Sequence, residues 1–245
     1  MRVLLLGTTG YHPTDDRETA CMLLPELGIA FDAGTGFFRV ARHLTTPTLD
    51  IFLSHAHLDH VAGLTYFFSL MVERPQTKIT VHGDEGKLNS IRDHLFAEDF
   101  FPARAPFDWR PATDTFTHSS GAVLRSFRLE HPGGSRGYRL EIGGKSMAYV
   151  TDTTARSGID YIEHIRGVDL LLHESNFPSG QDELARKTGH SCLDHVARVA
   201  KEAQVKRAVL VHFDPLMAIP PADFDAARKI FSALEPGHDN LEVTF

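Results

Sequence analysis

The amino-acid sequence predicts an α/β protein in which two β-sheets pack together with helices on their outer faces, a four-layer αββα sandwich. Three observations support this fold class. Short apolar runs alternate with amphipathic stretches along the whole chain. Hairpin-like strands come first in each half, and strand–helix units follow them. No repeat, low-complexity tract or flexible linker divides the sequence, so a single domain over residues 1–245 is expected.

The strands are predicted where short β-rich runs are bounded by turn residues. They are Arg2–Leu6, Cys21–Leu24, Ile29–Asp32, Leu49–Ser54, Lys78–His82, Val123–Leu129, Tyr138–Ile142, Ser146–Thr151, Asp169–His173 and Arg207–His212. The predicted helices are Asp59–Met71, Asp84–Leu95, Thr154–Ile165, Cys192–Ala203 and Pro221–Leu234. Ser191 is a plausible N-cap, and Pro221 stands in the first turn of the last helix, where proline is favoured.

Length and composition exclude several classes of protein. The chain has 245 residues, of which 42% are hydrophobic and 23% charged, which is enough apolar material for a sizeable core. Apolar runs such as Val3–Leu6 are far shorter than the roughly 20 residues that a membrane span needs, and no signal-peptide pattern is present. Two cysteines, Cys21 and Cys192, are too few for a disulfide framework. A soluble, cytoplasmic protein without a membrane partner is expected.

An aromatic stretch, Phe96–Trp109, has a high apolar content, two prolines and no period. One interpretation is a segment packed on the core or a dimer interface, which leaves a homodimer open. The other is a rim or lid over a pocket.

The strongest chemical signal is a cluster of histidines and an aspartate. The predicted strand Leu49–Ser54 runs directly into His55, His57, Asp59 and His60, which form an HxHxDH pattern. Residues at the carboxyl end of a strand reach into a shared crevice. Imidazole nitrogen and carboxylate oxygen are good ligands for Zn²⁺, Mn²⁺ and Fe²⁺, so the pattern predicts a metal site.

Further ligands are expected from later strand ends, because one turn cannot complete two coordination spheres. His131, Asp152 and His212 each lie at or just beyond the end of an apolar run. Each alone could be a capping or turn residue. Together with the HxHxDH pattern they are better explained as ligands.

In this order of residues the chain resembles the metallo-β-lactamase fold superfamily. The resemblance spans residues 1–215 and implies two divalent metal ions per chain, with zinc expected and manganese or iron as alternatives. It implies that one ion is held by His55, His57, His131 and Asp152, and the other by Asp59, His60, Asp152 and His212. It also implies that Asp32, in the FDAG turn at 31–34, supports the metal loop.

The C-terminal half resembles one branch of this superfamily. The segments DLLLHESN at 169–176, GHS at 189–191 and VLVHFDP at 209–215 are similar to those of ribonuclease Z and the phosphoribosyl cyclic phosphodiesterases. The resemblance implies that His190 contacts the scissile phosphate and is oriented by Glu174, so that Asp59, His190 and Glu174 are the expected catalytic residues. An imidazolium supported by a carboxylate can donate a proton to a leaving alkoxide. His173 is expected to be structural.

The substrate is predicted from departures from the tRNA-processing pattern. Only 21 positions separate His131 from Asp152, which leaves space for a hairpin but not for the tRNA-gripping arm that ribonuclease Z commonly carries there. The net charge of −7 also disfavours nucleic acid as a partner, although residues 101–145 carry seven Lys and Arg against four Asp and Glu. That basic segment faces either an anionic substrate or solvent. A small or cyclic, nucleotide-like phosphodiester is therefore expected as the substrate.

Three alternatives stay open. The first is a tRNA 3′-processing endonuclease, with RNA as the partner. The second is a thioester or other carboxylic-ester hydrolase on the same fold. The third is a non-catalytic binding protein on a decayed hydrolase fold.

Overall fold

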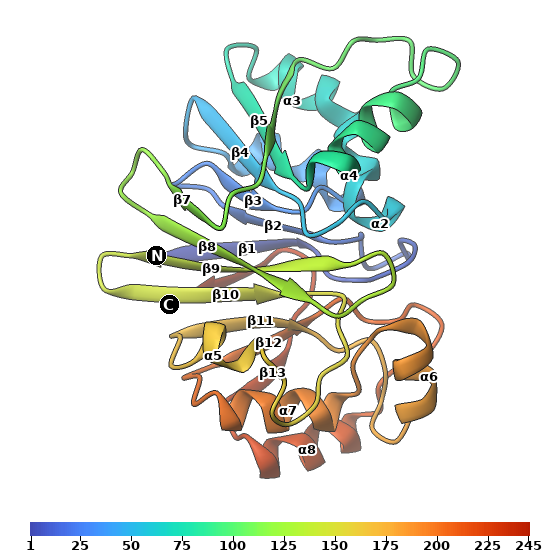
Figure 1. The fold of residues 1–245 in the computed structure, drawn as a ribbon, viewed down its shortest axis with the longest axis vertical. Coiled ribbons are helices and arrows are strands. Elements are labelled where there is room, and N and C mark those ends of the chain that lie inside the picture. Colours follow the sequence, from blue (N-terminus) through green and yellow to red (C-terminus); the bar gives the residue numbers. More distant parts are fainter. The chain divides into compact units, whose positions relative to one another are not determined.

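Contacts divide the chain into two units, each built around one seven-stranded sheet (Figure 1). The computed structural model describes all 245 residues. The first unit comprises residues 1–112 and 238–244, and the second comprises residues 113–237 and Phe245. That the two act as a single domain stays a prediction.

The sheet of the first unit changes from antiparallel to parallel pairing along its width. Its order is β14-β1-β2-β3-β4-β5-β6, antiparallel from β14 to β3 and parallel from β3 to β6. The strands are β1 (Arg2–Gly7), β2 (Cys21–Leu24), β3 (Ile29–Phe31), β4 (Thr48–Phe52), β5 (Lys78–Gly83), β6 (Phe107–Pro111) and β14 (Leu241–Thr244). The antiparallel half is made of the predicted hairpin-like strands β1, β2 and β3 together with β14, which the sequence analysis does not predict.

Helices pack on this sheet and close an apolar core with it. They are η1 (Thr35–Arg39), α1 (Val40–His43), α2 (Leu58–Val61), η2 (Ala62–Tyr66), α3 (Phe67–Glu73), α4 (Glu85–Ser90) and the π-helical turn η3 (Ile91–Leu95). Leu64, Phe67 and Leu70 are buried in one cluster with Ile51 and Val81 of the sheet. The apolar core thus determines the position of η2 and α3, which follow β4 and the histidine pattern.

The helix predicted over Asp59–Met71 is wrong as one continuous element, because it is broken into α2, η2 and α3. The break has a tertiary cause. The backbone N–H of Gly63 donates to the carbonyl of Ala33, and the N–H of Ala33 donates to the carbonyl of His60, both at 2.8 Å. These bonds replace the bonds that a continuous α-helix would make.

The aromatic stretch Phe96–Trp109 mostly belongs to the core of the first unit. Phe96, Phe101 and Trp109 pack against its apolar cluster, and Phe107, which is buried, is a member of it. Phe100 is the exception, with 83% of its surface exposed.

The second unit repeats the arrangement of pairings. Its order is β13-β12-β11-β10-β9-β8-β7, antiparallel from β7 to β10 and parallel from β10 to β13. The strands are β7 (Thr115–Thr117), β8 (Val123–Leu129), β9 (Ser135–Ile142), β10 (Lys145–Val150), β11 (Leu170–Glu174), β12 (Ala208–Val211) and β13 (Leu234–Pro236). The parallel strands β10, β11 and β12 are buried along most of their length, which explains their nearly continuous apolar sequence.

The helices of the second unit are α5 (Ile162–Ile165), α6 (Asp182–Thr188), α7 (Leu193–Glu202) and α8 (Pro221–Ile230). The long helices α7 and α8 lie side by side below β11–β13 in Figure 1 and share one apolar cluster with the sheet. No helix of either unit is both long enough and apolar enough to cross a membrane.

Two helix predictions in this unit need correction. The segment predicted as a helix over Thr154–Ile165 is helical only in α5, because its first part is a loop whose Ala155 N–H donates to the Ser191 hydroxyl at 2.9 Å. Ser191 is therefore not an N-cap, and Cys192 occupies that position without a side-chain hydrogen bond. The last predicted helix ends at Ile230, since Leu234 begins β13.

Candidate metal centre

The histidine pattern of the first unit runs from the loop after β4, which holds His55 and His57, into α2, which holds Asp59 and His60. His55 and His60 are buried, Asp59 is half-buried and His57 is exposed. The ring centroid of His55 lies 4.3 Å from that of His57 and 4.3 Å from that of His60. The Nε2 atom of His60 lies 3.5 Å from Oδ2 of Asp59. The four residues predicted from the HxHxDH pattern are therefore neighbours in space.

Asp32 holds this loop from beneath. Its carboxylate accepts hydrogen bonds from the backbone N–H of Ser54 at 2.7 Å, the Ser54 hydroxyl at 2.8 Å and Nδ1 of His60 at 2.8 Å. Because Nδ1 of His60 donates to Asp32, Nε2 is the ring nitrogen that remains for a metal ion. The expected support of the loop by Asp32 is confirmed.

Two contacts of Asp59 are not apparent in the sequence pattern. The backbone N–H of Tyr11, a residue with a φ of 58°, donates to Oδ2 of Asp59 at 2.8 Å. Gly34 lies so close that a Cβ atom there would be 2.1 Å from the carbonyl oxygen of Asp59. The Gly34 contact has a sequence signal in the FDAG turn. The Tyr11 contact has none beyond the turn-like sequence around Gly10.

In the second unit, the two oxygens of the Asp152 carboxylate face different histidines. Oδ2 lies 3.5 Å from Nε2 of His131, and Oδ1 lies 3.3 Å from Nε2 of His212. Asp152 and His212 have φ values of 50° and 57°, which are uncommon for residues other than glycine. Such strained backbone is typical of functional sites.

The Nδ1 atoms of His131 and His212 also contact protein groups. Nδ1 of His131 donates to the carbonyl of Gly189 at 2.9 Å, and the amide group of Asn176 lies 3.3 Å from Nδ1 of His212. Gly189 has a φ of 78°, and a Cβ there would clash with Pro132. Asn176 stands in the DLLLHESN segment, but sequence reasoning assigned it no function.

Glu174 and His190 form a hydrogen-bonded pair at the end of β11. Glu174 is fully buried and accepts hydrogen bonds from the backbone N–H groups of Thr153 at 2.7 Å and Ser191 at 3.0 Å, and from Nδ1 of His190 at 3.1 Å. Because Nδ1 of His190 donates to Glu174, Nε2 is the nitrogen left for chemistry. A ring nitrogen of His190 lies within 4.8 Å of a carboxylate oxygen of Asp152 and of a ring nitrogen of His212.

His173, next to Glu174, has a structural role, as predicted. It is fully buried, its Nδ1 donates to the carbonyl of Glu174 at 2.7 Å, and its Nε2 accepts from the Tyr161 hydroxyl at 2.8 Å. Burial lowers the pKa of His173, which favours the neutral ring that this pair of bonds requires.

The donor set of each unit fits divalent metal ions. The first unit presents three imidazoles and a carboxylate. The second presents the carboxylate of Asp152 between the imidazoles of His131 and His212, whose Nδ1 atoms contact protein groups. This combination, with oriented histidines and no thiolate, is typical of sites for zinc, manganese or iron.

Comparison with known proteins agrees with this chemistry. Residues 28–213 match the family model described as beta-lactamase superfamily domain. The chain is 26% identical over 283 residues to a ribonuclease Z of Metallosphaera sedula, covering 94% of each chain. It is 28% identical over 292 residues to a ribonuclease Z of Streptomyces avermitilis, covering 98% of this chain and 96% of that relative.

Solved structures show the same fold. The short form of human tRNase Z superimposes with a TM-score of 0.76 at 22% identity, covering 100% of this chain and 99% of that one. The metallo-beta-lactamase fold protein YhfI from Bacillus subtilis gives 0.78 at 20% identity, covering 99% and 98%. A diphosphatase from the PhnP family gives 0.76 at 18% identity, covering 100% and 97%.

The family model covers more than half of the chain, and the matched region includes all the histidines and aspartates of the two clusters. Two sheets flanked by helices, with the strand ends carrying these residues, are the fold expected from the sequence. The chain therefore belongs to the beta-lactamase superfamily and is a metal-dependent hydrolase with the metallo-β-lactamase fold.

Proposed function

We propose that the protein is a phosphodiesterase that uses two divalent metal ions to hydrolyse a small or cyclic, nucleotide-like phosphodiester. The observation that carries this proposal is the His190–Glu174 pair beside Asp152 and His212. An imidazole held by a buried carboxylate suits protonation of a leaving alkoxide, which phosphodiester hydrolysis requires.

The proposed metal ligands are divided between the two units. One ion is held by His55, His57, His131 and Asp152, and the other by Asp59, His60, Asp152 and His212. Support comes from Asp152, whose two oxygens face two different histidines as a bridging carboxylate requires. When bound, two such ions supply a nucleophilic water near neutral pH and neutralise charge on phosphoryl oxygens.

The protein groups have separate tasks in this mechanism. Glu174 holds Nδ1 of His190, so that a proton on Nε2 can pass to the leaving oxygen of the ester. Burial of Glu174 and its three backbone donors, Thr153, Ser191 and Asn176, keep the imidazole in one orientation. Asp59, held by the backbone of Tyr11, acts as both ligand and catalytic carboxylate.

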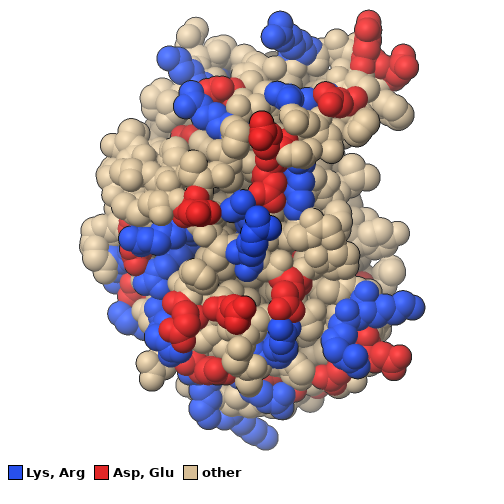
Figure 2. All heavy atoms as spheres, in the orientation of Figure 1, with Lys and Arg blue, Asp and Glu red and all other residues tan.

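The preference for a small substrate rests on what fills the interval between His131 and Asp152. The interval holds β9 and β10, joined by a turn at Gly143 and Gly144, and no inserted arm. The alignment with the M. sedula relative extends over 283 positions, more than this chain has residues, so that relative carries insertions that this chain lacks. Figure 2 also shows acidic and basic side chains interspersed on the face drawn, without a broad basic patch.

Processing of tRNA 3′ ends is the second candidate. It is supported by the relatives named ribonuclease Z, which match nearly the full length of this chain. The two candidates share the chemistry of the site and differ in the substrate that the surface must accommodate.

A turnover screen with metal-quantified protein tests the proposal. The substrates are bis(p-nitrophenyl) phosphate, 2′,3′- and 3′,5′-cyclic nucleotides, phosphoribosyl cyclic phosphate, a pre-tRNA and a thioester. We expect about two metal ions per chain and turnover of the small diesters. Cleavage of pre-tRNA alone would favour the second candidate, and turnover of the thioester alone would contradict both.

Variants separate metal binding from proton transfer. His190→Ala should keep its metal and lower kcat by about 10²–10⁴-fold on small diesters with an alkoxide leaving group, such as the cyclic nucleotides, because a general acid is lost. Asp152→Ala should lose both metal and turnover, and His238→Ala, at an exposed histidine outside the cluster, is the matched control. Full activity in His190→Ala, with an ester whose leaving group needs protonation, would contradict the assigned role.

A further inference from the structure

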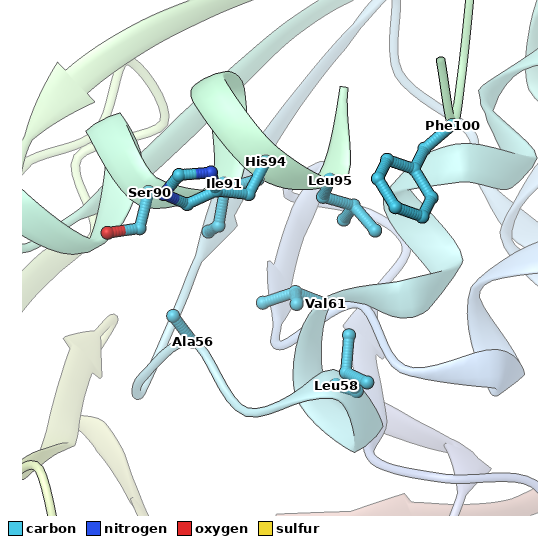
Figure 3. Close-up of a pocket in the computed structure, with 8 residues that line it drawn as sticks. All are labelled: Ala56, Leu58, Val61, Ser90, Ile91, His94, Leu95 and Phe100. Atoms are coloured by element: carbon cyan, nitrogen blue, oxygen red, sulfur yellow. The ribbon is translucent and has the colours of Figure 1, made fainter. Parts of the chain in front are cut away.

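A pocket of about 490 Å³ opens in the first unit directly beside the metal loop (Figure 3). One wall consists of Ala56, Leu58 and Val61. Ala56 and Leu58 alternate along the chain with His55, His57 and Asp59. A molecule in this pocket therefore lies against the same short loop that carries the proposed metal ligands.

The opposite wall is formed by a π-helical turn. Ile91, His94 and Leu95 line the pocket from η3, in which the N–H of Phe96 donates to the carbonyl of Ile91 at 3.2 Å. This bond spans five residues, as in a π-helix. Such turns are rare and are found frequently at functional sites.

The pocket is apolar inside and carries aromatic groups and a few polar ones. In Figure 3 the side chains of Val61, Ile91 and Leu95 point toward the same space, and the ring of Phe100 stands beside Leu95. The polar groups of the lining are the His94 imidazole and the Ser90 hydroxyl, which donates to the carbonyl of Gly86 at 3.1 Å and so can serve a ligand as an acceptor.

Two large apolar side chains at this pocket are exposed to solvent. Leu58 is 68% exposed and Phe100 is 83% exposed. Single exposed apolar residues need no explanation, but two of them lining one apolar pocket are typical of a binding site. A volume of about 490 Å³ lies within the usual range for small-molecule pockets.

We propose that this pocket binds the nucleobase of the phosphodiester substrate and so determines which diesters the enzyme prefers. The inference rests on the proposed function, since it places the base beside the metal loop. A flat base matches the pocket chemically, because its faces contact the apolar walls and stack on Phe100, while its polar edge meets Ser90 and His94.

The first test compares substrates that share a p-nitrophenolate leaving group. These are thymidine 5′-(p-nitrophenyl phosphate), phenyl p-nitrophenyl phosphate and methyl p-nitrophenyl phosphate. We expect kcat/KM for the thymidine ester to exceed that for the methyl ester by about tenfold or more, on the scale that apolar pocket contacts contribute. A preference for the phenyl ester over the thymidine ester would overturn the assignment to a nucleobase.

Two variants and a control locate the preference in the pocket. Ser90→Trp, which fills the pocket, and Phe100→Ser, which removes the stacking ring, should each reduce the thymidine-to-methyl ratio of kcat/KM to within about twofold of unity. The control is Val72→Trp on α3, where a residue that is 81% exposed lies outside the pocket lining. An unchanged ratio in both pocket variants would overturn the inference.

A binding measurement on metal-free protein separates this inference from the proposed function. Saturation-transfer NMR with thymidine should show transfer to the base protons in the native protein and in Val72→Trp, and little in Ser90→Trp. If thymidine binds in this way but no phosphodiester is turned over, the proposed function fails and the base site stands. If phosphodiesters are turned over but thymidine does not bind and the ratio is unity, the base site fails and the function stands.

Discussion

Asp32 determines which nitrogen of His60 is available to a metal ion. Its carboxylate receives Nδ1 of His60 at 2.8 Å and two hydrogen bonds from Ser54, and all three residues are buried. Asp32 itself has a φ of 57°, a conformation that aspartate and asparagine tolerate better than most residues. One side chain thus fixes the orientation of the metal loop without binding the metal.

Replacing Asp32 by Asn tests this role. Asparagine keeps the left-handed backbone but loses the charge that supports the imidazole, so zinc affinity should fall by about 10–100-fold. The measurement is a zinc titration against a competing chelator. Asp15→Asn, an exposed residue of the same unit, is the control and should keep the native affinity. Native affinity in Asp32→Asn would show that the charge of Asp32 does not tune His60 as a ligand.

The candidate ligands of the HxHxDH pattern could be recognised in the sequence because the pattern is local and chemically distinctive, and their binding of metal stays a prediction. The contacts that support the pattern could not be recognised, because they join distant segments. The Tyr11 N–H reaches Asp59 across 48 positions, and Ser191 reaches the carbonyl of Thr153 across 38 positions. Asn176 was overlooked for a related reason, since an amide beside a histidine is noticed only when the histidine's neighbours in space are known.

Among the strands and helices, long buried strands were predicted well and short exposed ones were missed. The strands β10, β11 and β12 have apolar runs that identify them. The strands β6, β7, β13 and β14 are the edge strands of the two sheets, and their sequences are short and partly polar. Helix α6 was also missed, because most of its residues are polar and only Ala185 is buried. Tertiary pairing, which a local pattern does not report, defines these elements.

Glycine 63 explains why the helix after the metal loop is broken, and it yields a paired prediction. A Cβ at Gly63 would lie 1.9 Å from the carbonyl oxygen of Gly34, whereas a Cβ at Gly86 in α4 meets nothing within 4 Å. Gly63→Ala should therefore destabilise the protein by about 1–3 kcal/mol or more through overpacking. Gly86→Ala should stabilise it by about 0.5–1 kcal/mol, because alanine is the better helix former.

Denaturant unfolding with a fitted midpoint and slope measures both changes. Metal content should fall in Gly63→Ala, since the Gly63–Ala33 and Ala33–His60 bonds hold the metal loop. It should be unchanged in Gly86→Ala. A Gly63→Ala variant with native stability and metal content would mean that the 33–63 contact is not needed for the loop.

Asp169 ties together the starts of neighbouring strands and gives a pH prediction. Its carboxylate accepts from Lys206 Nζ at 2.7 Å and from the N–H of Ser146 at 2.8 Å. The Lys206 hydrogen bond, and then the Ser146 bond, lower the pKa of Asp169 below its usual 3.8. Unfolding then takes up a proton, so this stabilisation is complete above about pH 4 and is lost as pH falls through the native pKa.

Asp169→Asn should lower the melting temperature by about 2–4 °C at pH 7, the shift that a loss of about 1 kcal/mol causes in a chain of this size. The difference from the native protein should be smaller at pH 3 than at pH 7, because below about pH 4 the unfolded chain takes up a proton that the native carboxylate resists. Calorimetry at the two pH values measures it. An equal difference at both would mean that the charge of Asp169 contributes nothing. Asp160→Asn is the control.

The charge of the whole chain favours a small diester over a folded RNA as the substrate. The net charge is −7, and the arginines of the basic segment 101–145 are partly neutralised within it. Arg125 and Arg139 both pair with Glu141, and Arg110 pairs with Asp108. Such pairs leave fewer cations for the phosphate backbone of a folded RNA.

The dependence of turnover on salt measures how many phosphates the protein contacts. For nucleic acids, the logarithm of the affinity falls with the logarithm of the salt concentration by about 0.7–0.9 per phosphate neutralised, and six to ten contacts cost about 10³–10⁵-fold between 50 and 200 mM. Because a diester such as bis(p-nitrophenyl) phosphate carries a single charge, its kcat/KM should fall by less than about fourfold over this range. A pre-tRNA cut by this protein should show a comparably shallow dependence if the surface has no RNA-binding region. A steep dependence for pre-tRNA, combined with a rate at low salt above that for every small diester, would show that the protein grips RNA without an arm between His131 and Asp152, and would assign it to tRNA processing.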